Sequence, residues 1–265
     1  MNIGIIGLGV VGSAVKNGFE KIGHSVSVFD TKYPDSTLAD VLGTEVCFLT
    51  LPTPPREDGS CDISIVERTL RDLEANGYGG LAVIKSTVEP GTTDRLSKEL
   101  KISLAFCPEF LRERAAYTDF AENHDVLVIG AYSDEHHGLI RETHGSLPKN
   151  VFLMTPLEAE LAKYFSNVYN ALRITFANEF YEVCTALGAD YGRIKHAMVH
   201  RQNIEDAYLD CNENFRGFGG VCLPKDTKAL AALVRKLGLD LKLFETIVEE
   251  NDKFKRTVPK GMRDV

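Results

Sequence analysis

Near the start of the chain lies the stretch Asn2-Ile3-Gly4-Ile5-Ile6-Gly7-Leu8-Gly9-Val10-Val11-Gly12. Its apolar beginning is typical of a buried parallel strand. A G-x-G-x-x-G pattern follows directly, and the residues after Gly12 have the apolar periodicity of a helix. Strand, glycine turn and helix in this order predict the first unit of a dinucleotide-binding α/β fold.

The three glycines have separate tasks in such a turn. We expect Gly7 to allow the tight turn, Gly9 to let a pyrophosphate approach, and Gly12 to let the helix pack on the strand. Val10 and Val11 begin the helix, whose N–H groups suit phosphate oxygens. The alternative is a glycine-rich turn without a ligand, which the flanking strand and helix make the weaker interpretation.

An acidic residue, Asp30, follows the next predicted strand, Ser25–Phe29. A carboxylate at this position accepts hydrogen bonds from the adenine-ribose hydroxyls and repels a 2′-phosphate. We therefore predict NAD rather than NADP as the cofactor. Lys32 is the one neighbouring residue that would soften this preference.

Strand and helix patterns alternate through residues 1–154. The further strands are expected at 45–50, 81–85, 102–106 and 125–129, with helices at 63–74 and 92–100. This alternation predicts an α/β fold with a Rossmann-like, doubly wound parallel sheet and helices on both faces. Residues 1–154 would form the NAD-binding domain.

Residues 155–265 have a helical pattern instead. Thr155-Pro156-Leu157-Glu158 is a capping box, and an apolar stripe continues at helical spacing to Leu187. More helices are expected at 190–200, 224–237 and 241–255, and residues 257–265 should fray. We predict an all-helical central domain over 155–265. Its long apolar stripe predicts a homodimer interface as well.

Composition excludes several classes of protein. With 44% hydrophobic and 26% charged residues, the chain is typical of a globular protein. A net charge of −8 argues against nucleic acid or an anionic membrane as a partner. Six cysteines without a C-x-x-C pair predict reduced thiols and a cytoplasmic location. The histidines lack partners at ligand spacing, so we expect no metal site.

A second unusual stretch is Arg216-Gly217-Phe218-Gly219-Gly220-Val221-Cys222-Leu223-Pro224-Lys225-Asp226. Pro224 suits the first position of a helix, which would place Cys222 just before a helix N-terminus. The helix dipole and a nearby lysine favour the thiolate, which is the nucleophilic form. The alternative is a buried structural cysteine in a glycine-rich turn.

The segment Gly217–Asp226 resembles the catalytic-cysteine segment of the UDP-glucose/GDP-mannose dehydrogenase family. The resemblance covers nearly the whole chain, which ends where that family normally begins one more domain. It implies NAD-dependent oxidation of the C6 alcohol of a nucleotide sugar, with UDP-glucose as the favoured substrate and a place in polysaccharide biosynthesis. Cys222 would hold the sugar as a thiohemiacetal and then a thioester, and Phe218, Gly219 and Gly220 would contact it.

Two loops after predicted strands match further family motifs. Pro52 and Thr53 resemble the loop beside the cofactor, although a rigid surface connector is an equal alternative. Ser86 and Thr87 resemble the Ser-Thr-Val segment, which implies cofactor contact and, for Thr87, a hold on the catalytic water. Capping of the next helix by Thr92 or Thr93 is compatible with that role.

A third loop resembles the Pro-Glu-Phe-Leu-x-Glu motif of the family. The resemblance makes Glu113 the general base and Glu109 a support of the site. Substrate contacts would come from Phe110, Leu111 and Arg112. Arg114 stands where many family members carry a small residue, which leaves the local backbone geometry open.

The resemblance also assigns roles on the predicted helices. Lys163 and Asn167 would point at the reacting sugar carbon, where a solvated helix face is the alternative. Asp226 would position water or the substrate hydroxyl together with Thr87. Arg201 would reach the nucleotide sugar of a neighbouring subunit, or else be a surface arginine.

Two functional alternatives stay open. The substrate would be GDP-mannose or another nucleotide sugar, or the chain would be an NAD-binding subunit that needs a partner for catalysis. Retention of the cysteine, lysine, asparagine, glutamate and aspartate together speaks against a decayed enzyme.

Overall fold

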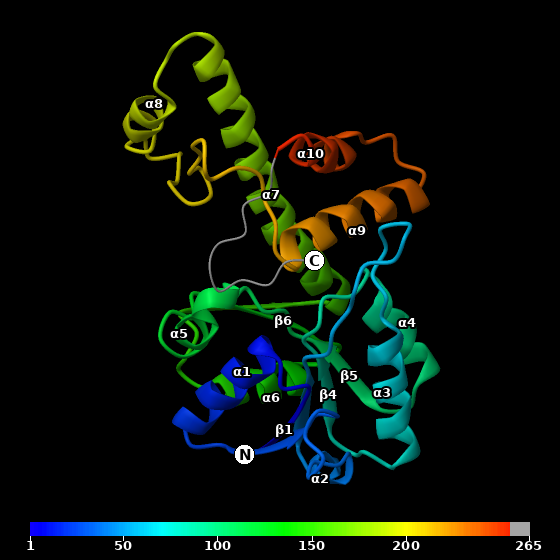
Figure 1. Ribbon diagram of the computed structural model, residues 1–265. Helices are drawn as coiled ribbons and strands as arrows, with labels where there is room; N and C mark the ends of the chain where they lie inside the picture. The colour runs from blue at the N-terminus through cyan, green and yellow to red at the C-terminus, as the bar shows by residue number, and fades with distance from the viewer. Residues whose placement is uncertain (255–265) are drawn as a thin grey trace. The chain divides into compact units, whose positions relative to one another are not determined.

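The computed structural model describes residues 1–254, so the tail predicted to fray, 257–265, lies outside the described residues. The chain divides into two compact units (Figure 1). Unit 1 comprises Met1–Arg56 and Cys61–Lys163, and unit 2 comprises Glu57–Ser60 and the residues from Tyr164 onward.

Unit 1 is built on one seven-stranded sheet with strand order β2-β1-β3-β4-β5-β6-β7 (Figure 1). The strands are β1 (Asn2–Ile6), β2 (Ser25–Phe29), β3 (Val46–Leu49), β4 (Leu81–Ile84), β5 (Ser103–Phe106), β6 (Val126–Gly130) and β7 (Asn150–Met154). The helices are α1 (Val10–Lys21), α2 (Ala39–Leu42), α3 (Ser64–Ala75), α4 (Thr92–Glu99), the 3-10 turn η1 (Glu113–Ala115), α5 (Ala116–Ala121) and α6 (Asp134–His144). The predicted Rossmann-like α/β class is confirmed.

The sheet departs from a fully parallel arrangement at one place. Strands β2, β1, β3, β4 and β5 are parallel neighbours, whereas β5 pairs with β6 in antiparallel fashion at Phe106 and Gly130. The connection between them is a loop with η1 and the short α5, which packs against α1. Apolar periodicity predicts that a strand exists but not its direction, so the sequence did not indicate this reversal.

The core of unit 1 lies between the sheet and its helices. Fully buried aliphatic and aromatic side chains from β1, β3 and α1 meet there, among them Ile3, Phe19 and Phe48. Since β1, β3, β4 and β5 run parallel, their carboxyl ends share one edge of the sheet. Ligands of such sheets bind beyond this edge. The glycine turn and the three motif loops follow these strands.

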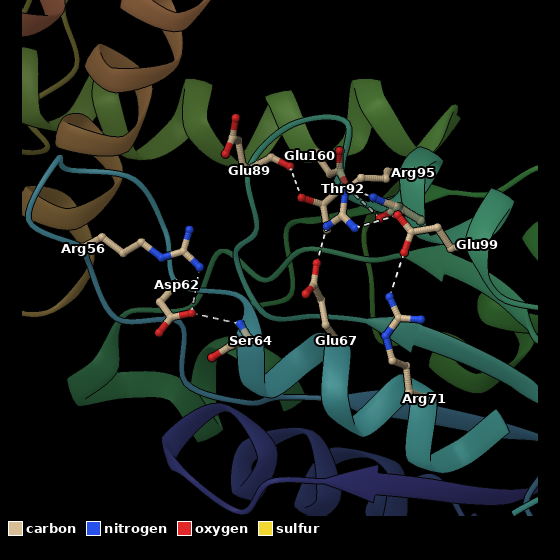
Figure 2. Close-up of polar contacts among 11 residues, drawn as sticks. Arg56, Asp62, Ser64, Glu67, Arg71, Glu89, Thr92, Arg95, Glu99 and Glu160 are labelled. Atoms are coloured by element: carbon tan, nitrogen blue, oxygen red, sulfur yellow. Dashed lines mark hydrogen bonds and ion pairs between the residues drawn. The ribbon is translucent and has the colours of Figure 1, made fainter. Parts of the chain in front are cut away.

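Ion pairs connect α3 with α4 at the surface of unit 1 (Figure 2). Arg95 pairs with Glu67 and, at 3.0 Å, with Glu99, which also accepts from Arg71 at 2.8 Å. Exposed pairs of this kind each contribute about 0–1 kcal/mol. They brace the two helices, but the buried core decides the fold.

The N-terminus of α4 is capped from another helix. Glu160, which is fully buried, accepts from the backbone N–H groups of Gly91 at 2.5 Å and Thr93 at 2.8 Å, and from the Thr93 hydroxyl at 2.6 Å. Burial raises the pKa of Glu160, and these hydrogen bonds oppose the shift. Gly91 is the N-cap residue, so self-capping by Thr92 or Thr93 is not what the structure shows.

The long predicted helix is α7 (Pro156–Ala186), and the capping box is confirmed. The Thr155 hydroxyl donates to Glu158 at 2.7 Å, and the Glu158 N–H returns a hydrogen bond at 3.3 Å. The C-terminal end of α7 is followed by Gly188, which adopts a left-handed conformation with φ 68°. This conformation ends a helix without strain only in glycine and a few other residues.

Unit 2 also contains α8 (Tyr191–Met198), α9 (Cys222–Lys236) and α10 (Leu243–Asp252). Val168, Ala171, Phe218 and Ile247 form one buried cluster, and Ala177, Cys184 and Tyr191 form a second. Asp190 caps α8 by accepting from the Arg193 N–H at 3.1 Å. Over residues 1–254, no helix combines the length and apolar character needed to cross a bilayer.

Candidate functional site

The glycine turn of unit 1 has the shape that a dinucleotide phosphate requires. Gly7 adopts φ 95°, and a Cβ on Gly12 would lie 1.9 Å from the Gly7 carbonyl oxygen. A Cβ on Gly9 would meet nothing within 4 Å, and no side chain caps the start of α1, where Val10 and Val11 lie. Open backbone and N–H donors at a helix N-terminus fit a pyrophosphate.

Asp30 lies beside this turn at the end of β2. Its Oδ2 accepts from the Leu8 N–H at 2.6 Å, and its Oδ1 accepts from the Lys32 N–H at 2.8 Å. The carboxylate therefore holds the turn in place. It also puts a negative charge where an adenine ribose would lie in a fold of this class.

Ser86 joins the two loops that follow β3 and β4. Its hydroxyl accepts from the Leu51 N–H at 2.7 Å and donates to the Leu49 carbonyl at 3.2 Å. The neighbouring predicted residues differ in exposure, since Thr53 is buried, Thr87 is half-buried and Pro52 is exposed.

Lys85, which sequence reasoning did not include in the site, links β4 to the third loop. It is buried, and its Nζ donates to the Cys107 carbonyl at 3.0 Å. In the sequence, only its position at the end of a strand, directly before Ser86, indicates that Lys85 lies near the site.

Lys163 and Glu109 form a buried ion pair within unit 1. The Lys163 Nζ lies 2.9 Å from the Glu109 Oε1, donates to the Glu109 carbonyl at 2.5 Å, and lies 5.7 Å from the ring centre of Phe110. The Glu109 Oε2 accepts from the Leu111 N–H at 2.7 Å. The motif loop is thus folded around the ammonium group, and the role of Glu109 in the site stays a prediction.

Arg112 fixes the next part of this loop. Its backbone N–H, Nε and Nη2 all donate to Asp119 on α5, at 2.9, 3.0 and 2.6 Å. Hydrogen bonds from Arg112 lower the pKa of Asp119. Glu113 is half-buried and begins η1. The backbone geometry at Arg114, which the sequence left open, does not require a glycine, because no residue of η1 has a positive φ.

Asp226 is the centre of a buried polar cluster in unit 2. Its Oδ2 accepts from the Asn167 Nδ2 at 2.6 Å, and its Oδ1 lies 2.5 Å from the Lys225 Nζ. Asp226 is 0% exposed, and Lys225 is 7% exposed. Asn167 and Lys163 both lie on α7, one turn apart. In the sequence Lys225 and Asp226 are adjacent, and the structure shows that their side chains pair.

Cys222 is the first residue of α9 and is exposed. The helix was predicted to begin at Pro224, and this boundary is wrong by two residues. A proline is tolerated throughout the first turn, because the N–H groups there have no partner within the helix. The thiol therefore lies at the N-terminus itself, where the helix dipole favours a thiolate.

The glycine-rich segment before Cys222 has glycines in left-handed conformations and one buried aromatic ring. Gly217 and Gly220 adopt φ 59° and 78°, and Phe218 is 3% exposed within the unit 2 core. Gly219 lies between these residues. Arg201 lies in the turn after α8, where its backbone N–H donates to the Met198 carbonyl at 3.0 Å.

Unit 2 also has a cavity of about 670 Å³ between α8 and the segment 206–215. Lys195 crosses it to pair with Asp206 at 2.6 Å and with Asp210. Burial raises the pKa of Cys211, which lines the cavity, to about 11. None of the predicted site residues lines it. Within residues 1–254 no cluster of three or more potential metal ligands occurs.

These features define a class of protein. A Rossmann-type sheet with a glycine turn and Asp30, in one chain with a helical unit that presents a cysteine, characterises an NAD-dependent dehydrogenase. Two family models match the chain: the NAD-binding domain of the UDP-glucose/GDP-mannose dehydrogenase family over residues 29–147, and its central domain over residues 157–253. The chain belongs to the UDP-glucose/GDP-mannose dehydrogenase family.

Individual relatives agree with this assignment. UDP-glucose 6-dehydrogenase AglM of Haloferax volcanii is 29% identical over 95% of this chain and 70% of its own length. The UDP-glucose 6-dehydrogenase of Rickettsia typhi is 30% identical over 95% of this chain and 67% of its own length. A solved UDP-glucose dehydrogenase from Pyrobaculum islandicum superimposes with a TM-score of 0.86 at 31% identity, covering 95% of this chain and 68% of that one.

The chain is shorter than these relatives. Other UDP-glucose 6-dehydrogenases are covered over only 50 to 55% of their length. Family, fold and NAD-binding domain are therefore shown for this chain directly, whereas the reaction of these relatives is not.

Proposed function

We propose that the chain oxidises the C6 alcohol of a nucleotide sugar to a carboxylate with NAD, and that UDP-glucose is the substrate. One observation carries the proposal: Cys222 is exposed at the start of α9, and one turn later Asp226 is buried between Asn167 and Lys225. A nucleophile at a helix N-terminus beside fixed amide and carboxylate groups suits covalent oxidation of an aldehyde. The names of the relatives favour UDP-glucose.

The proposed chemistry has two oxidations. NAD supplies the hydride acceptor for each of them. The first oxidation removes a hydride from C6 and the proton of its hydroxyl, which leaves an aldehyde. The Cys222 thiolate then adds to the aldehyde carbon, and a proton on the former carbonyl oxygen completes a thiohemiacetal. Loss of a second hydride and of the hydroxyl proton converts it into a thioester. Water then attacks the acyl carbon, the C–S bond breaks, and the thiol is released with the carboxylate product.

The other side chains have distinct proposed tasks. Lys163 and Asn167 stabilise the negative charge that develops on the sugar oxygen. Glu109 holds the Lys163 ammonium in position through the 2.9 Å pair. Glu113 removes a proton from the attacking water.

The remaining proposed contacts concern ligands. Thr87 and Asp226 position the water or the substrate hydroxyl. Pro52, Thr53 and Ser86 line the cofactor side, while Arg201 contacts the nucleotide sugar of a neighbouring subunit. The predicted domain division at residues 154 and 155 and the cytoplasmic location are likewise proposals.

We also propose a homodimer through α7. Large side chains along this helix are exposed, including Phe165 at 76% and Phe176 at 57%, and Leu187, directly after its last residue, is 78% exposed. Phe165 stacks on Tyr169 and Phe176 on Phe180, which makes two exposed aromatic pairs on the helix. A second copy would remove these side chains from water. Sedimentation analysis of wild type and Phe176→Glu tests it, and a wild type that stays monomeric at high concentration would exclude it.

The function is tested by mixing the chain with NAD and UDP-glucose and following NADH absorbance. We expect two NADH per sugar in wild type and at most one in Cys222→Ala, which lacks the thiol required for the second oxidation, with NAD binding retained. Cys47→Ala, at a buried cysteine of the sheet, is the control. If the chain turns over GDP-mannose but not UDP-glucose, GDP-mannose is the substrate. If it binds NAD but turns over no nucleotide sugar, the alternative of a subunit that needs a partner for catalysis is favoured.

A further inference from the structure

Two buried asparagines hold the backbone that leads to Cys222. Asn178 on α7 is 1% exposed, and Asn251 on α10 is 3% exposed. Both contact Gly217 or Phe218, and neither belongs to a motif that sequence reasoning selected. We propose that Asn178 and Asn251 are positioning residues that fix the Cys222 thiol at the start of α9. This inference rests on the proposed function, in which that thiol is the nucleophile.

Asn178 is a branch point between the long helix and the glycine-rich segment. Its Oδ1 accepts from the Gly217 N–H at 3.0 Å and from the Arg216 Nε at 2.8 Å, while its Nδ2 donates to the Ile174 carbonyl at 2.8 Å. The first two groups only donate and the third only accepts. A carboxamide in one orientation satisfies all three, whereas a carboxylate cannot.

Asn251 holds the next residue at both of its backbone groups. Its Oδ1 accepts from the Phe218 N–H at 2.7 Å, and its Nδ2 donates to the Phe218 carbonyl at 3.0 Å. The Phe218 ring is buried in the cluster with Val168 and Ile247. Ring and peptide are therefore fixed together, in a place where unpaired backbone groups would be costly.

Arg216, which donates to Asn178, is itself fixed by further contacts of its guanidinium group. Its guanidinium lies 4.8 Å from the ring centre of Tyr181 and 4.7 Å from that of Phe254, and it also pairs with Glu182. A planar guanidinium can stack and donate at the same time, which lysine cannot.

The segment between these contacts and the thiol is intrinsically flexible. Gly219 and Gly220 separate Phe218 from Val221 and Cys222, and glycine loses more conformational freedom on ordering than any other residue. Downstream, Asn167 holds Asp226 at 2.6 Å. Amides thus hold the chain before and after Cys222, which keeps the thiol at the helix N-terminus despite the two glycines.

The test replaces each amide by a carboxylate of equal size, Asn178→Asp and Asn251→Asp. We expect kcat to fall about 100-fold, because small displacements of a reacting group have effects of this size, while KM changes little. The rate of Cys222 alkylation by iodoacetamide, followed by mass spectrometry against pH, should shift toward higher pH in both variants. Asn170→Asp is the control, because Asn170 lies on α7 and accepts from Arg173 instead.

Arg216→Lys is the second variant in case the buried changes prevent folding. It should show smaller changes of the same sign. Lowered melting temperatures with an unchanged kcat and alkylation profile would overturn the proposal, since the asparagines would then act on stability alone. If wild type oxidises no sugar but the alkylation profiles still shift, the proposed function fails and the positioning role stands.

Discussion

The Nδ2 of Asn167 donates a 2.6 Å hydrogen bond to the Oδ2 of Asp226, joining α7 to the first turn of α9. On its other oxygen Asp226 meets the Lys225 ammonium at 2.5 Å. A fully buried carboxylate with one amide donor and one cation is a connected network, in which each member depends on the others.

We predict that Asp226→Asn destabilises the chain as well as reducing activity. The substitution keeps the side-chain volume but removes a counter-charge from Lys225, and breaking a buried ion pair costs about 3 to 5 kcal/mol. Guanidinium unfolding should show the loss in the absence of any ligand. Asp240→Asn, at an exposed position, is the control. Equal stability of Asp226→Asn and wild type would contradict the network.

A second prediction concerns cofactor choice. Wild type should bind NAD at least about tenfold more tightly than NADP, because the Asp30 carboxylate repels a 2′-phosphate. Asp30→Asn should narrow this difference, mainly by improving NADP, since an amide keeps one acceptor oxygen for the Leu8 N–H that Asp30 now accepts at 2.6 Å. Calorimetry measures both constants, with the exposed Asp35→Asn as control. Equal affinity of wild type for the two cofactors would refute the assignment.

The parts of this fold that the sequence predicted are those with a local signal. The turn at Gly7, the capping box at Thr155 and the strand before Asp30 depend on neighbours in the chain, and the structure confirms all three. The reversal of β6 has no such signal, because the residues that orient the strand lie on other elements.

The same distinction applies to the candidate site. Motif resemblance selected Cys222, Asp226 and Lys163, whose chemical types are conspicuous in the sequence. Asn178 and Asn251 pair with backbone groups more than thirty residues away, where any polar side chain looks like part of a solvated face. Only the packing of α7 and α10 in unit 2 identifies them.

The third prediction distinguishes the role of Glu113 as general base from that of Cys222 as nucleophile. Glu113→Gln should slow hydrolysis by about 10²- to 10⁴-fold, the usual contribution of a general base, and leave the earlier oxidations intact. With NAD and UDP-glucose present, intact-protein mass spectrometry should then detect a sugar thioester on Cys222. Glu135→Gln, on the exposed side of α6, should carry no adduct. An unmodified Glu113→Gln enzyme during turnover would exclude Glu113 as the base.

The last prediction concerns acid stability. His124 and His144 lie in the unit 1 core, where their rings are 5.8 Å apart and contact Phe120. Burial, with the positive charge of Lys85 as a smaller cause, lowers the pKa of His124 from 6.5 to about 4. The same causes lower the pKa of His144 well below 6.5. Both imidazoles are therefore neutral in the folded protein at pH values where the unfolded chain binds protons.

Since the unfolded state binds more protons between these pKa values, unfolding becomes easier as the pH falls from about 6.5 toward 4. His124 alone should account for about 3 kcal/mol over this range. Unfolding free energies at pH 7.5 and pH 5 should differ less in His124→Phe than in wild type, because a phenyl ring keeps the packing on Phe120 and binds no proton. His196→Phe, at an exposed histidine of α8, should keep the wild-type dependence. A pH dependence unchanged in His124→Phe would mean that this ring is protonated in the folded core as readily as in the unfolded chain.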